Sequence, residues 1–333
     1  NDPFFARTGV IFTIHNLAYQ GLFPKEELAT MGLSKECFTI DGLEFYGKVN
    51  LLKGGILSAD LVTTVSEAYC REIRTPEMGC GLHGVLQTRK EDLVGILNGL
   101  DYEEWNPAMD REIMKNYSHA SLSGKMVDKI GLQRLMGLAS APEIPVFGMV
   151  SRMVAQKGFD LIAELLPLIA KAPIQLVLLG NGEERYLKAF NDIKAAGARN
   201  ISFTSGFDHS LAPKIYAGSD MFLMPSFFEP CGLGQLIAMR YGTVPVVRRT
   251  GGLADSVFDP LDNDKAPNGF VFDEYSAEAL WEAINRALTA YQDKAFWKKL
   301  MRRGMSSDYS WQNSVHKYLE LYRKALLRKG GEA

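Results

Sequence analysis

Two cations stand five positions apart between an expected strand and an expected helix. Arg152 and Lys157 follow the apolar run 145–150, and Gly158 comes directly after Lys157. In an open parallel sheet, ligands bind at the carboxyl ends of the strands, which is where this segment falls. A guanidinium, an ammonium and the free N–H groups of a helix start together suit a diphosphate. The alternative is a pair of solvated loop charges, but two cations beside a glycine at this edge favour an anion site.

A second candidate segment, 225–235, also lies between an expected strand and an expected helix and reads Pro-Ser-Phe-Phe-Glu-Pro-Cys-Gly-Leu-Gly-Gln. Gly232 and Gly234 allow close approach of the backbone to a ligand. Because a carboxylate repels phosphate, Glu229 is expected either to accept hydrogen bonds from sugar hydroxyls or to face a developing positive charge. Its alternatives are capping of the helix and pairing with a surface cation. Cys231 is expected to be a small buried residue, since no histidine is near it in the sequence.

Two further polar residues stand at strand ends in the first third of the chain. His15 follows the run 10–14, and Asn98 follows the end of the run 93–97. His15 is either directed into a cleft or is a structural hydrogen-bonding residue. Asn98 has the same ambiguity, because Asn98-Gly99 is also a standard turn dipeptide.

Glycine-bearing loops after other expected strands extend this pattern. The loop Thr250-Gly251-Gly252 follows the run 244–247 and could cradle a phosphate. The loop 180–182, Gly-Asn-Gly, lacks the third glycine and the later acid of a dinucleotide fingerprint, so it is predicted to be a turn. Glycine-bearing strand ends in one sheet favour a phosphorylated ligand in a cleft between domains.

Short apolar strands that alternate with helices are expected to position these residues. Beyond residue 144, runs of aliphatic residues are each followed by a turn and a stretch of 3.6-residue periodicity. None of the runs alternates polar with apolar residues, which is typical of strands buried on both faces. We therefore predict an α/β fold with a doubly wound parallel sheet. The expected strands are 145–150, 174–179, 201–204, 221–224, 244–247 and 269–272.

A second α/β domain is expected upstream, where three more continuous apolar runs occur. Asn106-Pro107 breaks regular structure and is the best boundary candidate. A single amphipathic helix, 311–327, closes the chain. The upstream runs are 10–14, 61–65 and 93–97, and the expected divisions are a first domain at 1–105, a second at 106–308 and a closing segment at 309–333.

Composition limits the classes of function. The chain has 333 residues, of which 47% are hydrophobic and 23% charged, so disorder and a small stapled scaffold are excluded. A net charge of −2 supplies no basic field, and nucleic acid is not expected as a partner. The longest apolar stretch contains Asp160 and Glu164 and is shorter than the ~20 residues of a membrane span. Four sparse cysteines indicate reduced thiols rather than disulfides or a zinc site.

Taken in order, these motifs resemble the bacterial glycogen synthases and plant starch synthases, and the resemblance covers nearly the whole chain. It implies a GT-B fold, in which two Rossmann-like domains face each other across a cleft. It also implies retaining transfer of glucose from a nucleoside diphosphate sugar to the non-reducing end of an α-1,4-glucan. No metal or other cofactor is implied, and no membrane. The segments that carry the resemblance are 15–21, 52–56, 59–66, 95–99, 151–158, 228–232 and 250–253.

The same resemblance implies a donor, a location and roles for single residues. The loop 247–252 resembles the bacterial form, which favours ADP-glucose over UDP-glucose, and the location is the bacterial cytoplasm, or the plastid stroma for a plant protein. Arg152 and Lys157 would hold the diphosphate, and Glu229 would bind hydroxyls of the donor glucose. His15 and Asn98 would line the sugar site from the first domain. The remaining implied substrate-binding positions are Asn16, Phe207 as the aromatic residue on the base, Cys231, Gly232, Thr250 and Gly251.

One family motif is missing from the sequence. The Lys-x-Gly-Gly-Leu loop with which the family begins is not found before His15, so we expect about a hundred residues of the first domain to be absent from this chain. Ile237 stands where other retaining transferases have a second glutamate, as it does in glycogen and starch synthases. The alternatives are another GT-B enzyme, such as a sucrose-type synthase or a nucleotide-sugar epimerase, and a non-catalytic glucan-binding remnant.

Overall fold

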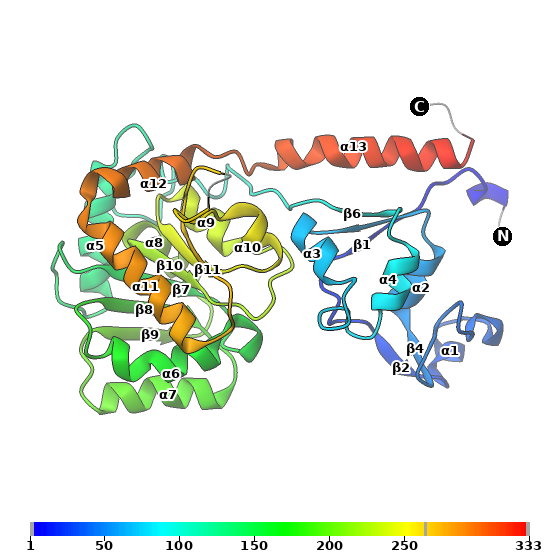
Figure 1. Cartoon of the computed structure of the whole chain (residues 1–333), viewed down its shortest axis with the longest axis horizontal. Helices are drawn as coiled ribbons and strands as arrows, with labels where there is room; N and C mark the ends of the chain where they lie inside the picture. The colour runs from blue at the N-terminus through cyan, green and yellow to red at the C-terminus, as the bar shows by residue number, and fades with distance from the viewer. Residues whose placement is uncertain (1–2, 263–264, 331–333) are drawn as a thin grey trace. The chain divides into compact units, whose positions relative to one another are not determined.

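The computed structural model describes residues 3–262 and 265–330, which form two compact units (Figure 1). Unit 1 consists of Asn1–Gly99 and Trp311–Ala333, and unit 2 of Leu100–Ser310. The first boundary between the two units, after Gly99, therefore lies before the expected boundary at 105. The reason is that Tyr102 and Trp105 pack against a hydrophobic cluster of unit 2.

Unit 2 is built on one sheet of parallel strands in the order β12-β11-β10-β7-β8-β9. Numbered along unit 2, this order is 6-5-4-1-2-3. Successive strands are therefore added outward on one side of β7 and then outward on the other, and the strand order reverses between β7 and β10. The predicted doubly wound sheet is confirmed, and each strand begins and ends within one residue of its expected bounds. The strands are β7 Val146–Val150, β8 Gln175–Gly180, β9 Ile201–Ser205, β10 Met221–Met224, β11 Val244–Arg248 and β12 Phe270–Phe272.

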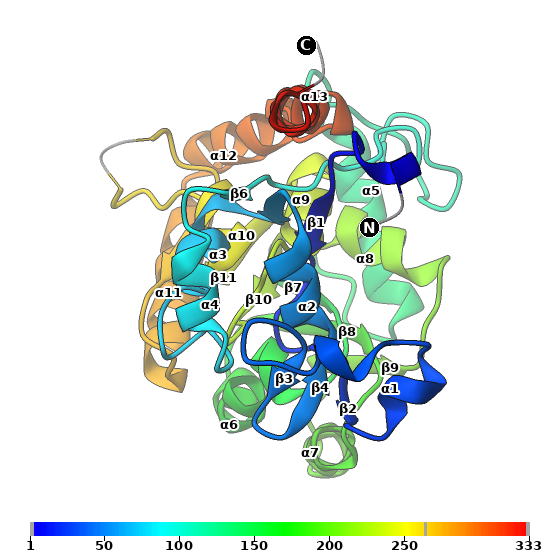
Figure 2. The same ribbon diagram turned by 90° about the vertical axis from the view of Figure 1, so that its right-hand side faces the viewer.

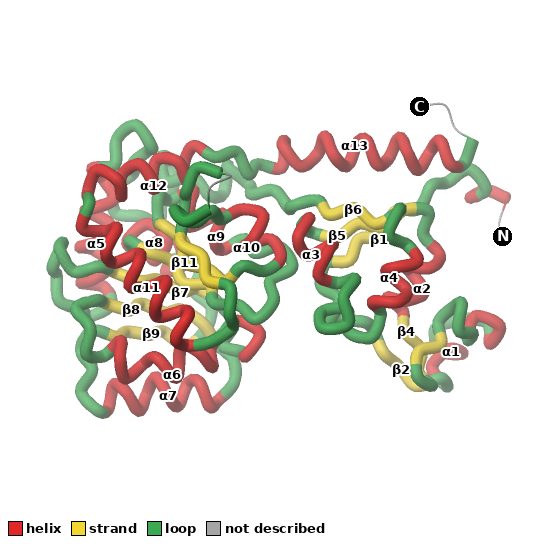
Figure 3. Tube along the Cα trace, in the orientation of Figure 1, coloured by secondary structure: helices red, strands yellow, loops and turns green. Residues whose placement is uncertain are grey.

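Helices cover both faces of this sheet, which explains the uninterrupted apolar strands. Leu176 and Leu178 pack into one core cluster with α6, α7 and α11, whereas Val177 and Leu179 pack on the other face against α5 and α8. The helices of unit 2 can be followed in Figure 3 and are α5 Ser123–Leu135, α6 Phe159–Ile169, α7 Glu184–Ala195, α8 Leu211–Gly218, α9 Gly234–Arg240, α10 Gly251–Ser256, α11 Ala277–Gln292 and α12 Lys294–Ser306.

Unit 1 contains a parallel sheet in the order β1-β5-β6 and a small antiparallel sheet in the order β2-β4-β3. The second sheet was not expected from the sequence, because its strands have only two or three residues. The strands are β1 Ile11–Ile14, β2 Leu22–Pro24, β3 Glu44–Phe45, β4 Lys48–Asn50, β5 Leu61–Thr64 and β6 Leu93–Gly95. The helices are α1 Glu27–Thr30, α2 Leu51–Ser58, α3 Glu67–Glu72, α4 His83–Thr88 and α13 Trp311–Arg328.

The closing helix α13, seen end-on in Figure 2, is part of unit 1. Leu321 and Ala325 pack in a core cluster with Leu61 and Ile96. The Ser314 hydroxyl donates a hydrogen bond of 2.7 Å to the carbonyl oxygen of Leu97, two residues beyond β6. Within residues 3–262 and 265–330, no helix has the length and apolar character needed to cross a membrane.

Candidate functional site

The loops that follow β7 and β10 are packed together at the carboxyl edge of the unit 2 sheet. Phe227 donates its backbone N–H to the carbonyl oxygen of Gln156 at 2.9 Å. Gly158 adopts a left-handed backbone with φ of 74°, and a Cβ built on it would lie 2.1 Å from the carbonyl oxygen of Pro225. Only glycine fits this approach without displacing a loop. The sequence therefore places a glycine where the two candidate segments meet.

This contact brings Lys157 and Glu229 into an ion pair. The Lys157 ammonium lies 2.5 Å from Oε2 of Glu229, and the Ser226 hydroxyl donates to the same oxygen at 3.0 Å. Glu229 is 5% exposed, so these two donors take the place of the water that would solvate an exposed carboxylate. The structure shows Glu229 in an ion pair, which is one of the alternatives that the sequence left open. Its partner is Lys157 of the other candidate segment.

A cavity of about 180 Å³ opens beside this pair. Its walls include the end of β7 at Ser151, both charged residues and the backbone at Gly232. Tyr216 and the buried Ile237 close it from the apolar side. Burial raises the pKa of the Tyr216 hydroxyl, which therefore stays protonated. The cavity thus offers one ammonium and one carboxylate against an apolar wall.

The loop after β11 packs against the backbone of the segment that carries Glu229. Gly252 donates its N–H to the carbonyl oxygen of Glu229 at 3.0 Å. A Cβ on Gly251 would lie 1.9 Å from that oxygen, and one on Gly252 would lie 1.8 Å from the carbonyl oxygen of Cys231. Thr250 and Cys231 are both buried. The two glycine loops, 229–234 and 250–252, are therefore in direct backbone contact.

Gln235, the first buried polar residue of α9, holds these loops and was not expected from the sequence to contribute to the site. Its side-chain amide donates to the carbonyl oxygens of Cys231 and Gly232 at 3.1 and 2.9 Å, and to the Ser256 hydroxyl at 3.1 Å. Ser256 in turn donates to the Gly252 carbonyl at 2.6 Å. No sequence motif marks this role, because the amide donates mainly to backbone carbonyl oxygens.

Arg152 and Phe207 stand on loops at the same edge of the sheet. Arg152 follows β7 in the loop that carries Lys157. Phe207 follows β9, is 80% exposed and touches only His209 among aromatic rings of the described chain. An aromatic side chain so exposed does not belong to the core, which was its alternative role.

His15, Asn16 and Asn98 belong to unit 1. His15 and Asn16 follow β1, whereas Asn98 follows β6, and β5 lies between these strands in the sheet. His15 is exposed, and the side-chain oxygen of Asn16 accepts the N–H of Ala18 at 3.0 Å. Within residues 3–262 and 265–330, no three His, Cys, Asp or Glu side chains are grouped so that they could hold a metal ion.

Comparison with known proteins identifies the family. Residues 1–88 match the model of the starch synthase catalytic domain, and residues 138–303 match the model of glycosyl transferases group 1. A glycogen synthase of Geotalea uraniireducens is 65% identical over 329 residues, which are 99% of this chain and 68% of the relative. The chain belongs to the glycogen synthase family. A second relative, glycogen synthase 2 of Geobacter sulfurreducens, is 58% identical over 325 residues, 98% of this chain and 67% of that protein.

Solved structures agree with this glycogen synthase assignment. The catalytic domain of starch synthase IV from Arabidopsis thaliana, bound to ADP and acarbose, superposes with a TM-score of 0.92 at 36% identity, over 98% of this chain and 69% of that one. The fold is therefore GT-B, and the chain is a retaining glycosyltransferase of the glycogen and starch synthases. Sucrose-phosphate synthase of Thermosynechococcus elongatus, at 20% identity and a TM-score of 0.58 over 84% of this chain and 61% of that one, shares the fold alone. The other GT-B enzymes considered from the sequence are thus set aside.

Proposed function

We propose that this glycogen synthase binds ADP-glucose in the cavity beside Lys157 and Glu229. The observation that carries the proposal is the ion pair itself, at the carboxyl edge of the sheet and at the reversal of strand order, where ligands of open α/β sheets bind. An ammonium and a carboxylate 2.5 Å apart match the two chemical parts of a nucleotide sugar, its phosphates and its hydroxyls.

In this proposal, donor binding separates the pair. The Lys157 ammonium turns to the diphosphate, joined by Arg152 from the same loop, and both cations stabilise the negative charge that grows on the departing nucleotide. Glu229, released from the lysine, accepts hydrogen bonds from hydroxyl groups of the glucose. Ser226 keeps the carboxylate oriented, since it already donates to Oε2.

The backbone of the glycine loops provides the remaining contacts that we propose. The main chain at Gly232, which lines the cavity, and at Gly251, in the loop packed against Glu229, contacts the donor in this proposal, and φ angles of 70° and 44° require glycine at both positions. The amide of Gln235 holds the carbonyl oxygens of Cys231 and Gly232, so these polar groups are satisfied within the protein and do not face the phosphates.

Two observations support adenine as the base, and the similarity to glycogen synthases supports an α-1,4-glucan as the acceptor. The similar starch synthase IV was solved with ADP, and the loop 247–252 of this chain resembles the bacterial form. The exposed ring of Phe207 is suited to stacking on a base. The curated relatives are bacterial glycogen synthases, so we place the reaction in the bacterial cytoplasm.

Calorimetric titration of this chain with ADP-glucose and, separately, with UDP-glucose tests the proposal. We expect saturable binding of ADP-glucose and at least about tenfold weaker binding of UDP-glucose, as a changed base contact of about 1.4 kcal/mol would give. Preference for UDP-glucose would overturn the assignment of the base. Absence of binding of both donors to a chain with a cooperative melting transition would overturn the assignment of the site.

A further inference from the structure

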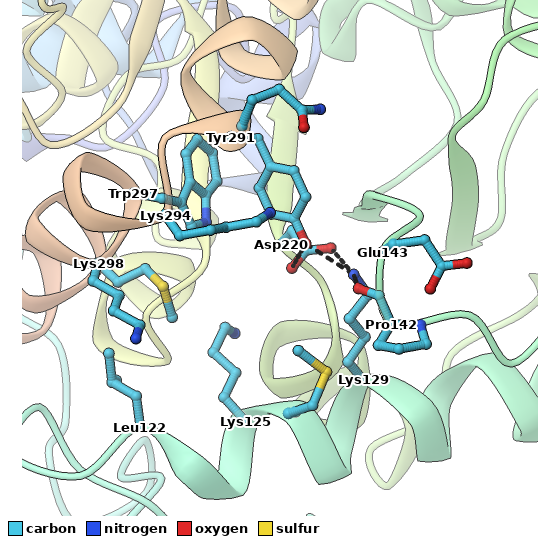
Figure 4. Close-up of a pocket in the computed structure, with 13 residues that line it drawn as sticks. Leu122, Lys125, Lys129, Pro142, Glu143, Asp220, Tyr291, Lys294, Trp297 and Lys298 are labelled. Carbon is cyan, nitrogen blue, oxygen red and sulfur yellow. Dashed lines mark hydrogen bonds and ion pairs between the residues drawn. The ribbon is translucent and has the colours of Figure 1, made fainter.

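A second cavity, of about 510 Å³, lies at the opposite edge of the unit 2 sheet. It is enclosed by α5, α12 and the end of α11 (Figure 4). Asp220, in its wall, directly precedes β10, and its Oδ2 accepts the N–H of Val146 at the start of β7 at 2.8 Å. The cavity thus lies at the amino ends of the same strands whose carboxyl ends carry the donor site, and it shares no lining residue with that site.

Two buried lysines in its wall are already satisfied by the protein. The Lys129 ammonium donates to Asp220 and to the Pro142 carbonyl, both at 2.7 Å, and to the Tyr291 hydroxyl at 3.0 Å. The Lys125 ammonium donates to the carbonyl of Ala217 at 2.9 Å and to the Thr243 hydroxyl at 2.7 Å, among others. These two amines are structural, and their hydrogen bonds within the protein leave neither available to a ligand.

The lysines on α12 are placed differently. Lys294 and Lys298 are one helical turn apart, both are exposed, and no ion pair with a carboxylate of the described chain is found for them. The Lys294 ammonium lies 3.3 Å from the centre of the Tyr291 ring. Desolvation of its ammonium lowers the pKa of Lys294, against the charge of Asp220, which raises it, and together with the charge of Lys129, which lowers it further. Like charges at this spacing repel each other, and an anion placed between them would remove the repulsion.

The side chains around these lysines limit what such an anion would be. Lys294–Ser306 contains no Asp or Glu, and Glu143 lines the cavity from the side facing away from α12 in Figure 4. The apolar part of the lining includes Met126, Trp297 and Met301. Methionine side chains adapt to flat ligands, and small-molecule pockets measure roughly 300–1,000 Å³.

We propose that this cavity is a second ligand site, which binds a small organic anion with its charged group at Lys294 and Lys298 and a flat apolar body against Met126, Trp297 and Met301. A simple inorganic anion would leave the apolar wall exposed to water, and an uncharged aromatic molecule would leave the like charges of Lys294 and Lys298 without a counter-charge. The site therefore requires both parts in one molecule.

Calorimetry with 1-naphthyl phosphate, inorganic phosphate and 1-naphthol tests this requirement. We expect 1-naphthyl phosphate to bind at least about tenfold more tightly than either part alone. The double variant Lys294→Gln, Lys298→Gln should weaken its binding by about tenfold or more, since two charge-assisted contacts are lost. Lys299→Gln is the matched control, because Lys299 is an exposed lysine of the same helix that does not line the cavity.

A second pair of measurements separates this site from the donor site. Met126→Glu would add a carboxylate to the lining of the cavity, and we expect it also to weaken 1-naphthyl phosphate binding. Lys157→Ala, at the other edge of the sheet, should leave that binding unchanged. Binding that persists in the double variant, that Lys157→Ala abolishes, or that is absent from a folded chain overturns the proposal.

Discussion

Gly158 packs against Pro225 so closely that a Cβ at position 158 would lie 2.1 Å from the Pro225 carbonyl oxygen. The contact joins the loop after β7 to the loop after β10, two strands that are neighbours in the sheet but far apart in the chain. Because Lys157 directly precedes this glycine, the approach of the two backbones is what brings its ammonium to Glu229.

Replacement of Gly158 by alanine should therefore separate the pair. The variant combines backbone strain at a φ of 74° with a steric conflict, and we expect the free energy of unfolding to fall by about 1–3 kcal/mol. Donor affinity should fall in parallel, as measured by calorimetry. Gly197→Ala is the control, because Gly197 has a φ of 96° but a Cβ added to it would meet no atom within 4 Å. Equal donor affinity in both variants would contradict a role of the contact in the site.

Loss of the Lys157 charge should weaken every ligand that carries the diphosphate. We expect Lys157→Ala to raise the dissociation constants of ADP and of ADP-glucose by about 10- to 100-fold, the value of a charge-assisted hydrogen bond of about 1.5–3 kcal/mol. Arg152→Ala should act in the same direction. Lys171→Ala, at an exposed lysine of the same unit, serves as the control. Near-normal ADP binding by both site variants would mean that Lys157 and Arg152 are solvated loop charges without a role in donor binding.

Glu229→Gln should instead distinguish the sugar from the nucleotide. The amide keeps the shape of the side chain but accepts hydrogen bonds less strongly than a carboxylate, so ADP-glucose should bind about tenfold more weakly. ADP, which has no glucose, should bind as well as before or better, because the amide no longer competes for Lys157. Equal weakening of ADP and ADP-glucose would show that Glu229 acts only on the lysine.

The doubly wound sheet could be predicted because its strands are continuous apolar runs between turn residues, with helices on both faces. The sheet β2-β4-β3 could not, since Leu22, Phe23 and Pro24 are all exposed and give no periodic signal. Lys157 and Glu229 could be singled out separately, because each follows a strand. Their pairing requires the order of strands in space, which a single run of residues does not encode.

Gln235 could not be predicted as a site residue because its hydrogen bonds go to backbone carbonyls, a contact without a sequence motif. Gln235→Glu tests the importance of this clamp. At neutral pH the carboxylate would face the carbonyl oxygens of Cys231 and Gly232, and we expect the free energy of unfolding to fall by about 1–3 kcal/mol.

The defect of Gln235→Glu should depend on pH with a definite sign. Burial next to carbonyl oxygens raises the pKa of the new carboxyl above its unfolded value of about 4.3, and the neutral form donates a hydrogen bond again. Stability relative to the parent chain should therefore be higher at pH 5 than at pH 8, as measured by urea unfolding. A defect of the same size at both pH values would mean that the amide does not hold the loops through donation.

For the parent chain, Lys125 leads us to expect the opposite pH dependence, a stability that rises with pH. Burial lowers the pKa of this lysine to about 7 from an ordinary value of 10.5, against the charges of Asp220 and Asp128, which raise it. Between pH 7 and 10.5 the unfolded chain then binds more protons than the folded chain, so this group makes stability rise with pH. The slope from this single group is at most about 1.4 kcal/mol per pH unit.

Comparison with Lys125→Met isolates this contribution. The thiols of Cys70 and Cys80, whose pKa burial raises, act in the other direction at higher pH and are common to both chains. The difference in unfolding free energy between parent and variant, measured by urea unfolding from about pH 7 to 9, should therefore increase with pH in favour of the parent chain. Parallel curves over this range would mean that Lys125 keeps its proton in the folded state, held by the carbonyl oxygens of Ala217 and Tyr241 that accept from it.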